Sequence, residues 1–322
     1  MGKKAEGHGI TALPQSGGAA GSGSPRKAPD LLAFGALGGA MFLWSGSFIA
    51  MKVALLEFHP VLILFIRMLG SVILLTPFLR RWFREAPYKN GDLRLFAVLM
   101  VSEPCLYFMF EGYALQYTTA SQAGIVTSLL PLLVGVGAFF FLKERLSPAA
   151  WAGFFLAVGG VVWLTLAGSE DVSAPDALLG NSLEFCAMLM ACNYTLCVRK
   201  LMHYPPFFLS AMQAIAGMVF FGVVFACMGF PLPESAPTLY PLLSLLFLAT
   251  VTVIAYGFYN IGVARLSAGQ AAAWTNLIPA LTLFMGIVFL GESLNFFQSL
   301  AIPLILAGMA LSQLGKYSSP KE

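Results

Sequence analysis

The chain contains the stretch ASQAGIVTSLLPLLVGVGAFFFLKERL at residues 120–146 and, 148 positions later, the stretch AGQAAAWTNLIPALTLFMGIVFLGESL at residues 268–294. The two stretches align without a gap, and the gap-free alignment extends beyond them to Gly160 in the first copy and Gly308 in the second. The shared residues include Gln122/Gln270, Thr127/Thr275, Pro131/Pro279, Glu144/Glu292 and Gly160/Gly308. Self-similarity at a fixed distance indicates that the chain is built from two copies of one unit.

The composition around these copies is that of a membrane protein. Of the 322 residues, 58% are hydrophobic and 10% are charged, and the mean hydropathy is +0.81. Soluble domains carry about a quarter charged residues. Because a helix needs roughly 20 apolar residues to cross the hydrocarbon core, the sequence predicts an all-α polytopic membrane protein. Ten stretches qualify: 31–51, 60–79, 93–115, 119–142, 148–167, 178–200, 206–228, 239–263, 268–290 and 295–315.

The basic residues set the predicted orientation, because cytoplasmic loops are enriched in Lys and Arg. With the N-terminus inside, 16 of the 18 Lys and Arg fall on the cytoplasmic side. Five spans in each half make the second half enter the membrane from the opposite side, which predicts ten transmembrane helices as two inverted five-helix repeats. We expect a protein of the cell (inner or plasma) membrane with both termini in the cytoplasm. The expected divisions are a disordered tail (1–30), two repeats (31–167 and 178–315) and a C-terminal tail (316–322).

Charged residues inside predicted spans are the first candidates for function, because each costs about 2.5–3.5 kcal/mol at the bilayer centre. Arg67 lies in the second span, Glu103 and Glu111 in the third, and Glu184 in the sixth. Glu103, Tyr107 and Glu111 are four residues apart and form one polar stripe. Two acids then face one base, so we expect this stripe and Arg67 to line a solute pathway; a structural ion pair is the alternative for Arg67. An acid without a base would suit a coupling proton or the attraction of a cation.

A second group of candidates combines aromatic rings with hydroxyl and amide groups. Such residues form an apolar cavity with a few polar groups, which is what a small organic solute requires. Hydrogen bonds between neighbouring helices are the alternative. The candidates are Trp44, Ser47, Asn193, Tyr194, Tyr256, Trp274 and Asn276.

Proline and glycine add two further expectations. Pro131 and Pro279 lie mid-span at matching repeat positions, where a proline removes a backbone hydrogen bond and tends to kink the helix. We expect them to be gating kinks, with a static packing kink as the alternative. The Gly-rich run at 159–160 and Gly308 predict close contact between helices.

Several local motifs resemble those of a known family. A glutamate follows both the fourth and the ninth span, and the motifs read WSGSFIAMK at residues 44–52, TTASQA at 118–123 and SAGQAA at 267–272. Together with the five-plus-five arrangement they resemble the drug/metabolite transporter superfamily, specifically its EamA-type ten-helix members, over residues 32–315. The resemblance implies a transporter that works as an exporter. It leaves the substrate open, because the superfamily carries amino acids, drugs, sugars and other metabolites.

The predicted function is secondary transport of a small organic metabolite, amino acid or drug-like solute by alternating access. The sequence has no nucleotide-binding motif, so a gradient is the expected energy source. Enzyme chemistry is disfavoured because no His or Asp lies within a predicted span, and cysteines without CxxC spacing predict neither a metal nor another cofactor. The expected partners are the solute, the bilayer and, as one option, a coupling proton; a net charge of +3 gives no nucleic-acid footprint. A channel or a non-transporting membrane partner subunit is the alternative, and the oligomeric state is left open.

Overall fold

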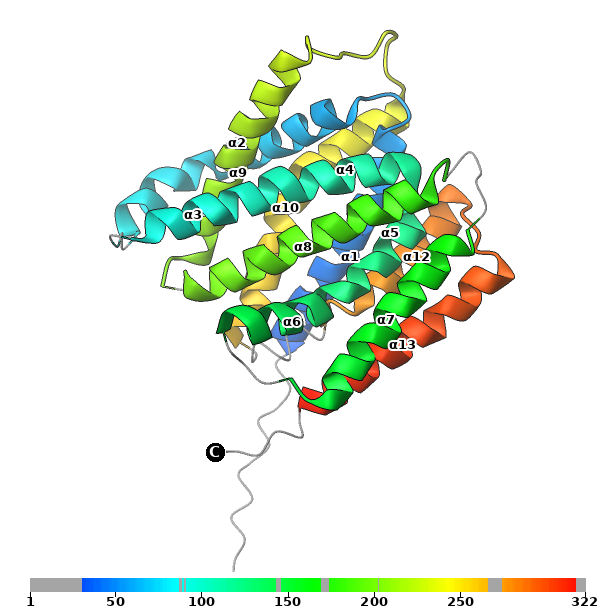
Figure 1. Cartoon of the computed structure of the whole chain (residues 1–322). Helices are drawn as coiled ribbons and strands as arrows, with labels where there is room; N and C mark the ends of the chain where they lie inside the picture. Colours follow the sequence, from blue (N-terminus) through cyan, green and yellow to red (C-terminus); the bar gives the residue numbers. More distant parts are fainter. Residues whose placement is uncertain are drawn as a thin grey trace, which may run out of the picture. The chain divides into compact units, whose positions relative to one another are not determined.

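The computed structural model describes residues 31–86, 89, 91–142, 146–168, 174–201, 203–265 and 274–316, and the elements in them are all helices (Figure 1). They are α1 (Leu31–Ala54), α2 (Pro60–Glu85), α3 (Asp92–Met100), η1 (Val101–Leu106), α4 (Tyr107–Tyr117), α5 (Ala120–Val126), η2 (Thr127–Leu129), α6 (Leu130–Leu142), α7 (Pro148–Leu166), α8 (Ala177–Lys200), α9 (Pro206–Cys227), α10 (Leu239–Arg265), α12 (Leu277–Leu290) and α13 (Phe296–Lys316). η1 is a π-helix and η2 a 3-10 helix. The all-α prediction is confirmed.

The helices coincide with the predicted spans to within a few residues. α3, η1 and α4 together fill the third predicted span, and α5, η2 and α6 fill the fourth. Among the described residues, seven helical segments are long and apolar enough to cross a membrane, and α12 and the part Phe296–Ser312 of α13 are shorter apolar segments. α8 is 24 residues long but carries Asn181, Glu184 and Asn193, which lower its hydropathy. The start of the ninth predicted span, residues 268–273, lies outside the described residues.

Local sequence explains where several helices begin and end. Thr119 and Ser147 each accept a hydrogen bond from the backbone amide three residues ahead, at 3.1 Å in both cases. Such N-caps satisfy an amide that has no partner within the helix. Pro148 follows directly, at the first helical position, where a missing amide costs nothing. At the other end, Gly291 closes α12 in the left-handed conformation, with φ 66°.

The helices pack in pairs that join the two halves of the chain, as Figure 1 shows for α4 with α8 and for α7 with α13. The other main pairs are α1 with α10, α2 with α9 and α5 with α12. α1 and α8 are the first helices of the two repeats, and α4 and α10 belong to the third span of each. Exchanging the two repeats therefore converts the α1–α10 pair into the α8–α4 pair and leaves the other three pairs unchanged. This is the packing expected of two repeats related by a pseudo-two-fold axis.

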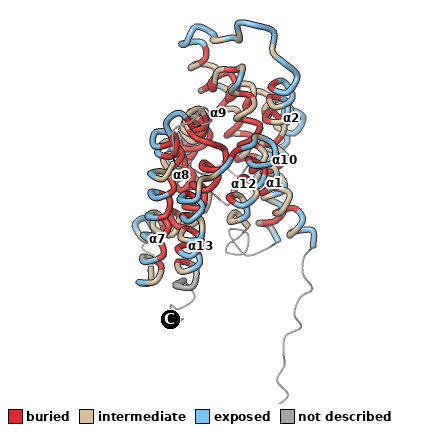
Figure 2. Tube along the Cα trace, turned by 90° about the vertical axis from the view of Figure 1, so that its right-hand side faces the viewer, coloured by how far each residue is buried: buried red, intermediate tan, exposed pale blue. Residues whose placement is uncertain are grey.

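The distribution of burial matches a lipid environment. Figure 2 shows buried residues concentrated where helices face one another and exposed residues on the outer faces. Many of the exposed side chains are large and apolar, among them Phe42, Phe141, Phe155 and Phe289, each more than half exposed. Soluble monomers rarely expose contiguous apolar patches of large area. This outer surface is therefore suited to contact with lipid chains.

Small residues allow α7 and α13 to approach closely. A Cβ on Gly153 would lie 2.4 Å from the backbone nitrogen of Ser312, and one on Gly308 would lie 2.5 Å from a backbone nitrogen of α7. Gly160 also faces α13, whereas Gly159 has nothing within 4 Å. Of the two adjacent glycines that the sequence singles out, only the second therefore makes the expected contact.

We predict that Gly153→Ala and Gly308→Ala each destabilise the protein by about 1–3 kcal/mol, the usual cost of an overpacked contact. Gly159→Ala, on the same helix as Gly153, should be neutral because its methyl group enters open space. Thermal unfolding in detergent measures the difference. Equal melting temperatures for the Gly153 and Gly159 variants would show that these glycines do not carry the contact.

Candidate functional site

A cavity of about 880 Å³, measured out to its opening, lies among helices of both halves. α1, α2, η1, α4, η2 and α6 line it from the first half, and α8, α10 and α12 from the second. The lining residues are Trp44, Ser47, Phe48, Arg67, Glu103, Tyr107, Phe108, Glu111, Thr127, Leu130, Met188, Ala191, Tyr194, Thr195, Tyr256, Tyr259, Thr275 and Ile278.

Two pairs of lining residues are repeat equivalents within the gap-free part of the alignment. Thr127 and Thr275 are 148 positions apart, and so are Leu130 and Ile278. Each copy therefore contributes the same two positions to one cavity, which is lined by residues of both repeats. In membrane folds built from inverted repeats, ligand sites lie at the interface between the repeats.

Arg67 is the one basic side chain among the lining residues, and it is 3% exposed. Its Nη1 lies 3.5 Å from Oε2 of Glu111, and its Nε donates a 3.0 Å hydrogen bond to Oγ1 of Thr252. Its Cζ lies 4.1 Å from the ring centroid of Phe108, which is a cation–π contact. The hydroxyl of Tyr107 donates a 2.8 Å hydrogen bond to the other oxygen of Glu111. Arg67 and Glu111 thus form a well-partnered buried ion pair.

Glu103 lies at a break in its helix because the next residue is proline. A proline disfavours helical backbone in the residue before it, and Glu103 has φ −144° and ψ 116°. The backbone oxygen of Glu103 accepts a 3.2 Å hydrogen bond from Nε2 of Gln213, and its side chain accepts one from the hydroxyl of Tyr256. Gln213 is the eighth residue of α9, as Arg67 is of α2. The second half therefore has a neutral side chain at the position where the first half has a charge.

Three aromatic rings from α1 and α10 lie together in the lining. The centroid of Trp44 lies 5.3 Å from that of Tyr256, edge to face, and 5.2 Å from that of Tyr259. The hydroxyl of Ser47 donates a 2.6 Å hydrogen bond to the backbone oxygen of Trp44, which ties one turn of α1 together. Aromatic faces near a carboxylate such as Glu103 are favourable surroundings for a positively charged organic group.

The structure brings most of the predicted residues into this cavity: Trp44, Ser47, Arg67, Glu103, Tyr107, Glu111, Tyr194 and Tyr256. Asn193, Trp274 and Asn276 are not among the lining residues. Asn193 donates a 2.8 Å hydrogen bond to Oγ of Ser102, and Trp274 stacks on Phe34 with centroids 5.8 Å apart. Oδ1 of Asn276 is buried without a partner among the described residues. Asn193 and Trp274 here make contacts between helices, and a place in the solute pathway stays a prediction for these three and for the eight that line the cavity.

The two predicted gating prolines each lie in the first turn of a helical segment. Pro131 is the second residue of α6, directly after η2, and Pro279 is the third residue of α12. The α-helical geometry is interrupted just before both of them, because a proline cannot donate the hydrogen bond that would continue it. Their role in gating stays a prediction.

Several residues at the site do not appear among the candidates drawn from sequence, among them Phe108, Thr252 and Thr127. Phe108 and Thr252 lie in apolar stretches, and no sequence signal distinguishes them from residues that face lipid. Thr127 does have a signal, because it matches Thr275 in the repeat. Among the described residues, no group of three or more His, Cys, Asp or Glu side chains is placed to hold a metal ion.

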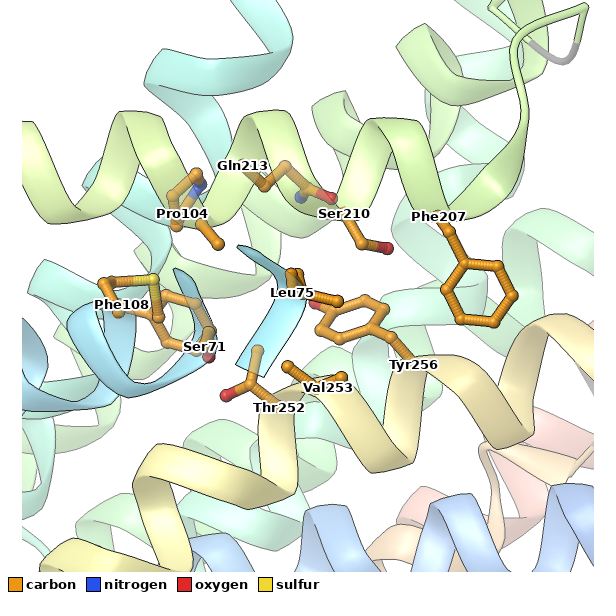
Figure 3. Close-up of a pocket in the computed structure, with 12 residues that line it drawn as sticks. Ser71, Leu75, Pro104, Phe108, Phe207, Ser210, Gln213, Thr252, Val253 and Tyr256 are labelled. Atoms are coloured by element: carbon orange, nitrogen blue, oxygen red, sulfur yellow. The ribbon is translucent and has the colours of Figure 1, made fainter. Parts of the chain in front are cut away.

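A second, smaller cavity of about 420 Å³ lies between α2, η1, α9 and α10 (Figure 3). Phe108 and Tyr256 line both cavities, so their rings form a shared wall. Gln213 and Ser210 bring polar groups from α9, while Leu75 and Phe207 are apolar (Figure 3). A movement of Tyr256 would therefore affect the shape of both cavities.

Glu292 fastens the end of α12 to the start of α5. Its two carboxyl oxygens accept hydrogen bonds from the backbone amides of Ala120 and Ser121, at 2.7 and 2.8 Å. These amides are the first of α5, where a carboxylate also meets the positive end of the helix dipole. This geometry gives Glu292 a structural role. Its repeat counterpart, Glu144, lies outside the described residues.

Comparison with known proteins finds relatives of both halves. The model of the EamA-like transporter family matches residues 31–166 and again residues 178–314. The uncharacterized transporter YetK of Bacillus subtilis (strain 168) is 31% identical over 228 residues, which cover 68% of each chain. An uncharacterized transporter of Archaeoglobus fulgidus is 29% identical over 280 residues, 84% of this chain and 94% of the relative. A crystal structure of a protein with 20% identity has a TM-score of 0.59 over 90% of this chain and 98% of its own, which shows a shared fold alone.

We predict that Glu111→Gln lowers the free energy of unfolding by about 3–5 kcal/mol, because it leaves Arg67 buried without its counter-charge. The double variant Arg67→Gln/Glu111→Gln removes both charges and should recover much of that loss. A glutamine already stands at the equivalent position of α9, so the helix accommodates it. Unfolding of the two single variants and the double variant completes the cycle. Losses that simply add would show that the two side chains do not interact.

Proposed function

This chain belongs to the EamA-like transporter family, and on that premise we propose that it is a gradient-driven secondary transporter. In this proposal it moves a small organic solute across the cell membrane by alternating access, with both termini in the cytoplasm. We propose export as the direction, on the resemblance of its motifs to the EamA-type exporters. Transport, and not catalysis, is the proposed role of the cavity residues.

The observation that carries this proposal is a cavity to which both repeats contribute equivalent residues. Two inverted copies of one unit can exchange conformations, so that an inward-open and an outward-open state have similar energies. A cavity between the copies is then reached from one side in each state. Thr127 and Thr275 line the cavity from equivalent positions, which is the arrangement that such an exchange requires.

The lining favours a solute with an apolar body and a positive group. Arg67 stands against two acids, Glu103 and Glu111, so the three charges sum to −1 when all are ionised. Trp44, Tyr256 and Tyr259 offer aromatic faces that suit both an apolar body and a cation. An amine-bearing metabolite, an amino acid and a drug-like cation all have these two parts.

A channel is the competing function, and a non-transporting partner subunit is another. A channel needs no alternation between states, so flux through it does not depend on solute at the far side. The binding site of a carrier returns to the outer side faster when it carries solute. An excess of solute inside a vesicle therefore accelerates uptake from outside. This counterflow separates a carrier from the other two.

We predict counterflow in proteoliposomes for radiolabelled amines, quaternary ammonium compounds or zwitterionic amino acids, and none for acidic amino acids or neutral sugars. Glu103→Gln should lower the rate at least about tenfold, because it removes a charge-assisted contact worth about 1.5–3 kcal/mol. Glu234→Gln makes the same chemical change in an exposed loop and should match the wild type.

Flux without counterflow would favour a channel, and no flux for any probe would favour a partner subunit. Equal counterflow in wild type and Glu103→Gln would remove Glu103 from the proposed solute site while leaving transport itself in place.

A further inference from the structure

Glu184 is a buried acid that does not line the cavity. It is 0% exposed, and both of its carboxyl oxygens lack a hydrogen-bond partner among the described residues. Asn181, one turn earlier on α8, is hydrogen-bonded to three other side chains instead. One turn later, Met188 lines the main cavity. An unpartnered acid therefore lies one helical turn from the cavity wall.

The ionisable groups that face Glu184 come from α4. Glu184 interacts electrostatically with Glu111 and Tyr107, while Arg67 lies beside Glu111. α5, η2, α6 and α7 also pack against α8 and carry no ionisable side chain among their described residues. α3 and η1 contact the other half of α8, and their acids have partners of their own, in the pairs Asp92–His203 and Glu103–Tyr256.

A bare carboxylate is unfavourable in these surroundings. Burial removes its hydration, and neither a counter-charge nor a hydrogen-bond donor among the described residues replaces that hydration. The charged group that acts on it, Glu111, is another acid and adds repulsion. Hard metal cations need several oxygen ligands, and among the described residues no group of three or more His, Cys, Asp or Glu side chains is placed to supply them here. A proton needs only the carboxyl group itself, and it removes the charge.

We propose that Glu184 is a proton-binding site that couples solute movement to a proton gradient, an inference that rests on the proposed transport function. Glu111 connects this site to the cavity, because it lines the cavity and repels an ionised Glu184. A positively charged solute beside Glu111 weakens that repulsion and so favours release of the proton. By linkage, protonation of Glu184 favours release of the solute. The result is an exchange of solute for proton, in which only the carboxyl O–H bond forms and breaks.

Transport by Glu184→Gln tests the coupling. Glutamine has the shape and neutrality of the protonated acid, so counterflow should stay within about twofold of wild type. Accumulation of the same probe amine against its gradient, driven by an imposed pH difference, should be lost in Glu184→Gln and kept in Glu234→Gln. Equal pH-driven accumulation in Glu184→Gln and wild type would overturn the proposal, and so would accumulation in the wild type driven by a sodium gradient in place of the pH difference.

A spectroscopic measurement tests the site without a solute. Infrared difference spectra of the purified full-length protein, recorded as pH is changed, should contain the C=O stretching band of a protonated carboxyl group that is absent in Glu184→Gln. Identical spectra for the two proteins would overturn the proton site. Failure of all counterflow in the wild type would count against the proposed function instead, so the two failures are distinguishable.

Discussion

Lipid chains offer no hydrogen-bond partner to a peptide group or a polar side chain, and this constraint governs most of the structure. Helices satisfy it along their length, and specific side chains satisfy it where a helix breaks or begins. Gln213 donates to the backbone of Glu103 at the break in the third span, and Glu292 accepts from the first amides of α5. Arg67 meets the same requirement through Glu111 and Thr252. The unpartnered carboxyl group of Glu184 is conspicuous against this background.

The interrupted helices and the cavity occur at the same place. Glu103 belongs to η1, within the third span, and Thr127 belongs to η2, within the fourth; both line the cavity. Membrane proteins tolerate irregular backbone at depth only where it is buried in protein or lines a cavity. Broken helices are also where transport proteins build their ligand sites, because they present polar backbone and side chains to the lumen. The same breaks in helical geometry therefore belong to the fold and form part of the site.

The sequence predicted the fold well because its signals are long and redundant. Ten apolar stretches and a repeat that runs without a gap from 120 to 160 leave few alternatives. The charged part of the site was also predictable, because the charges of Arg67, Glu103 and Glu111 are costly in lipid and need polar partners or a cavity. Phe108 and Thr252 could not be predicted, because the sequence does not distinguish a phenylalanine that packs against a guanidinium from one that faces lipid. Their roles arise from which helices pack together, as α2 does with α10, and that is a tertiary property.

The junction at Glu292 has a consequence for how the two duplicated halves can diverge. Its donors are main-chain amides, which every residue except proline supplies. Replacement of Ala120 or Ser121 by another small residue leaves those donors in place, and the limit on size comes from the burial of both side chains. The acidic partner is restricted in its chemistry, to a side chain long enough to reach both amides. Substitutions can therefore accumulate in one copy of the repeated unit while the contact between the two copies at Glu292 is kept.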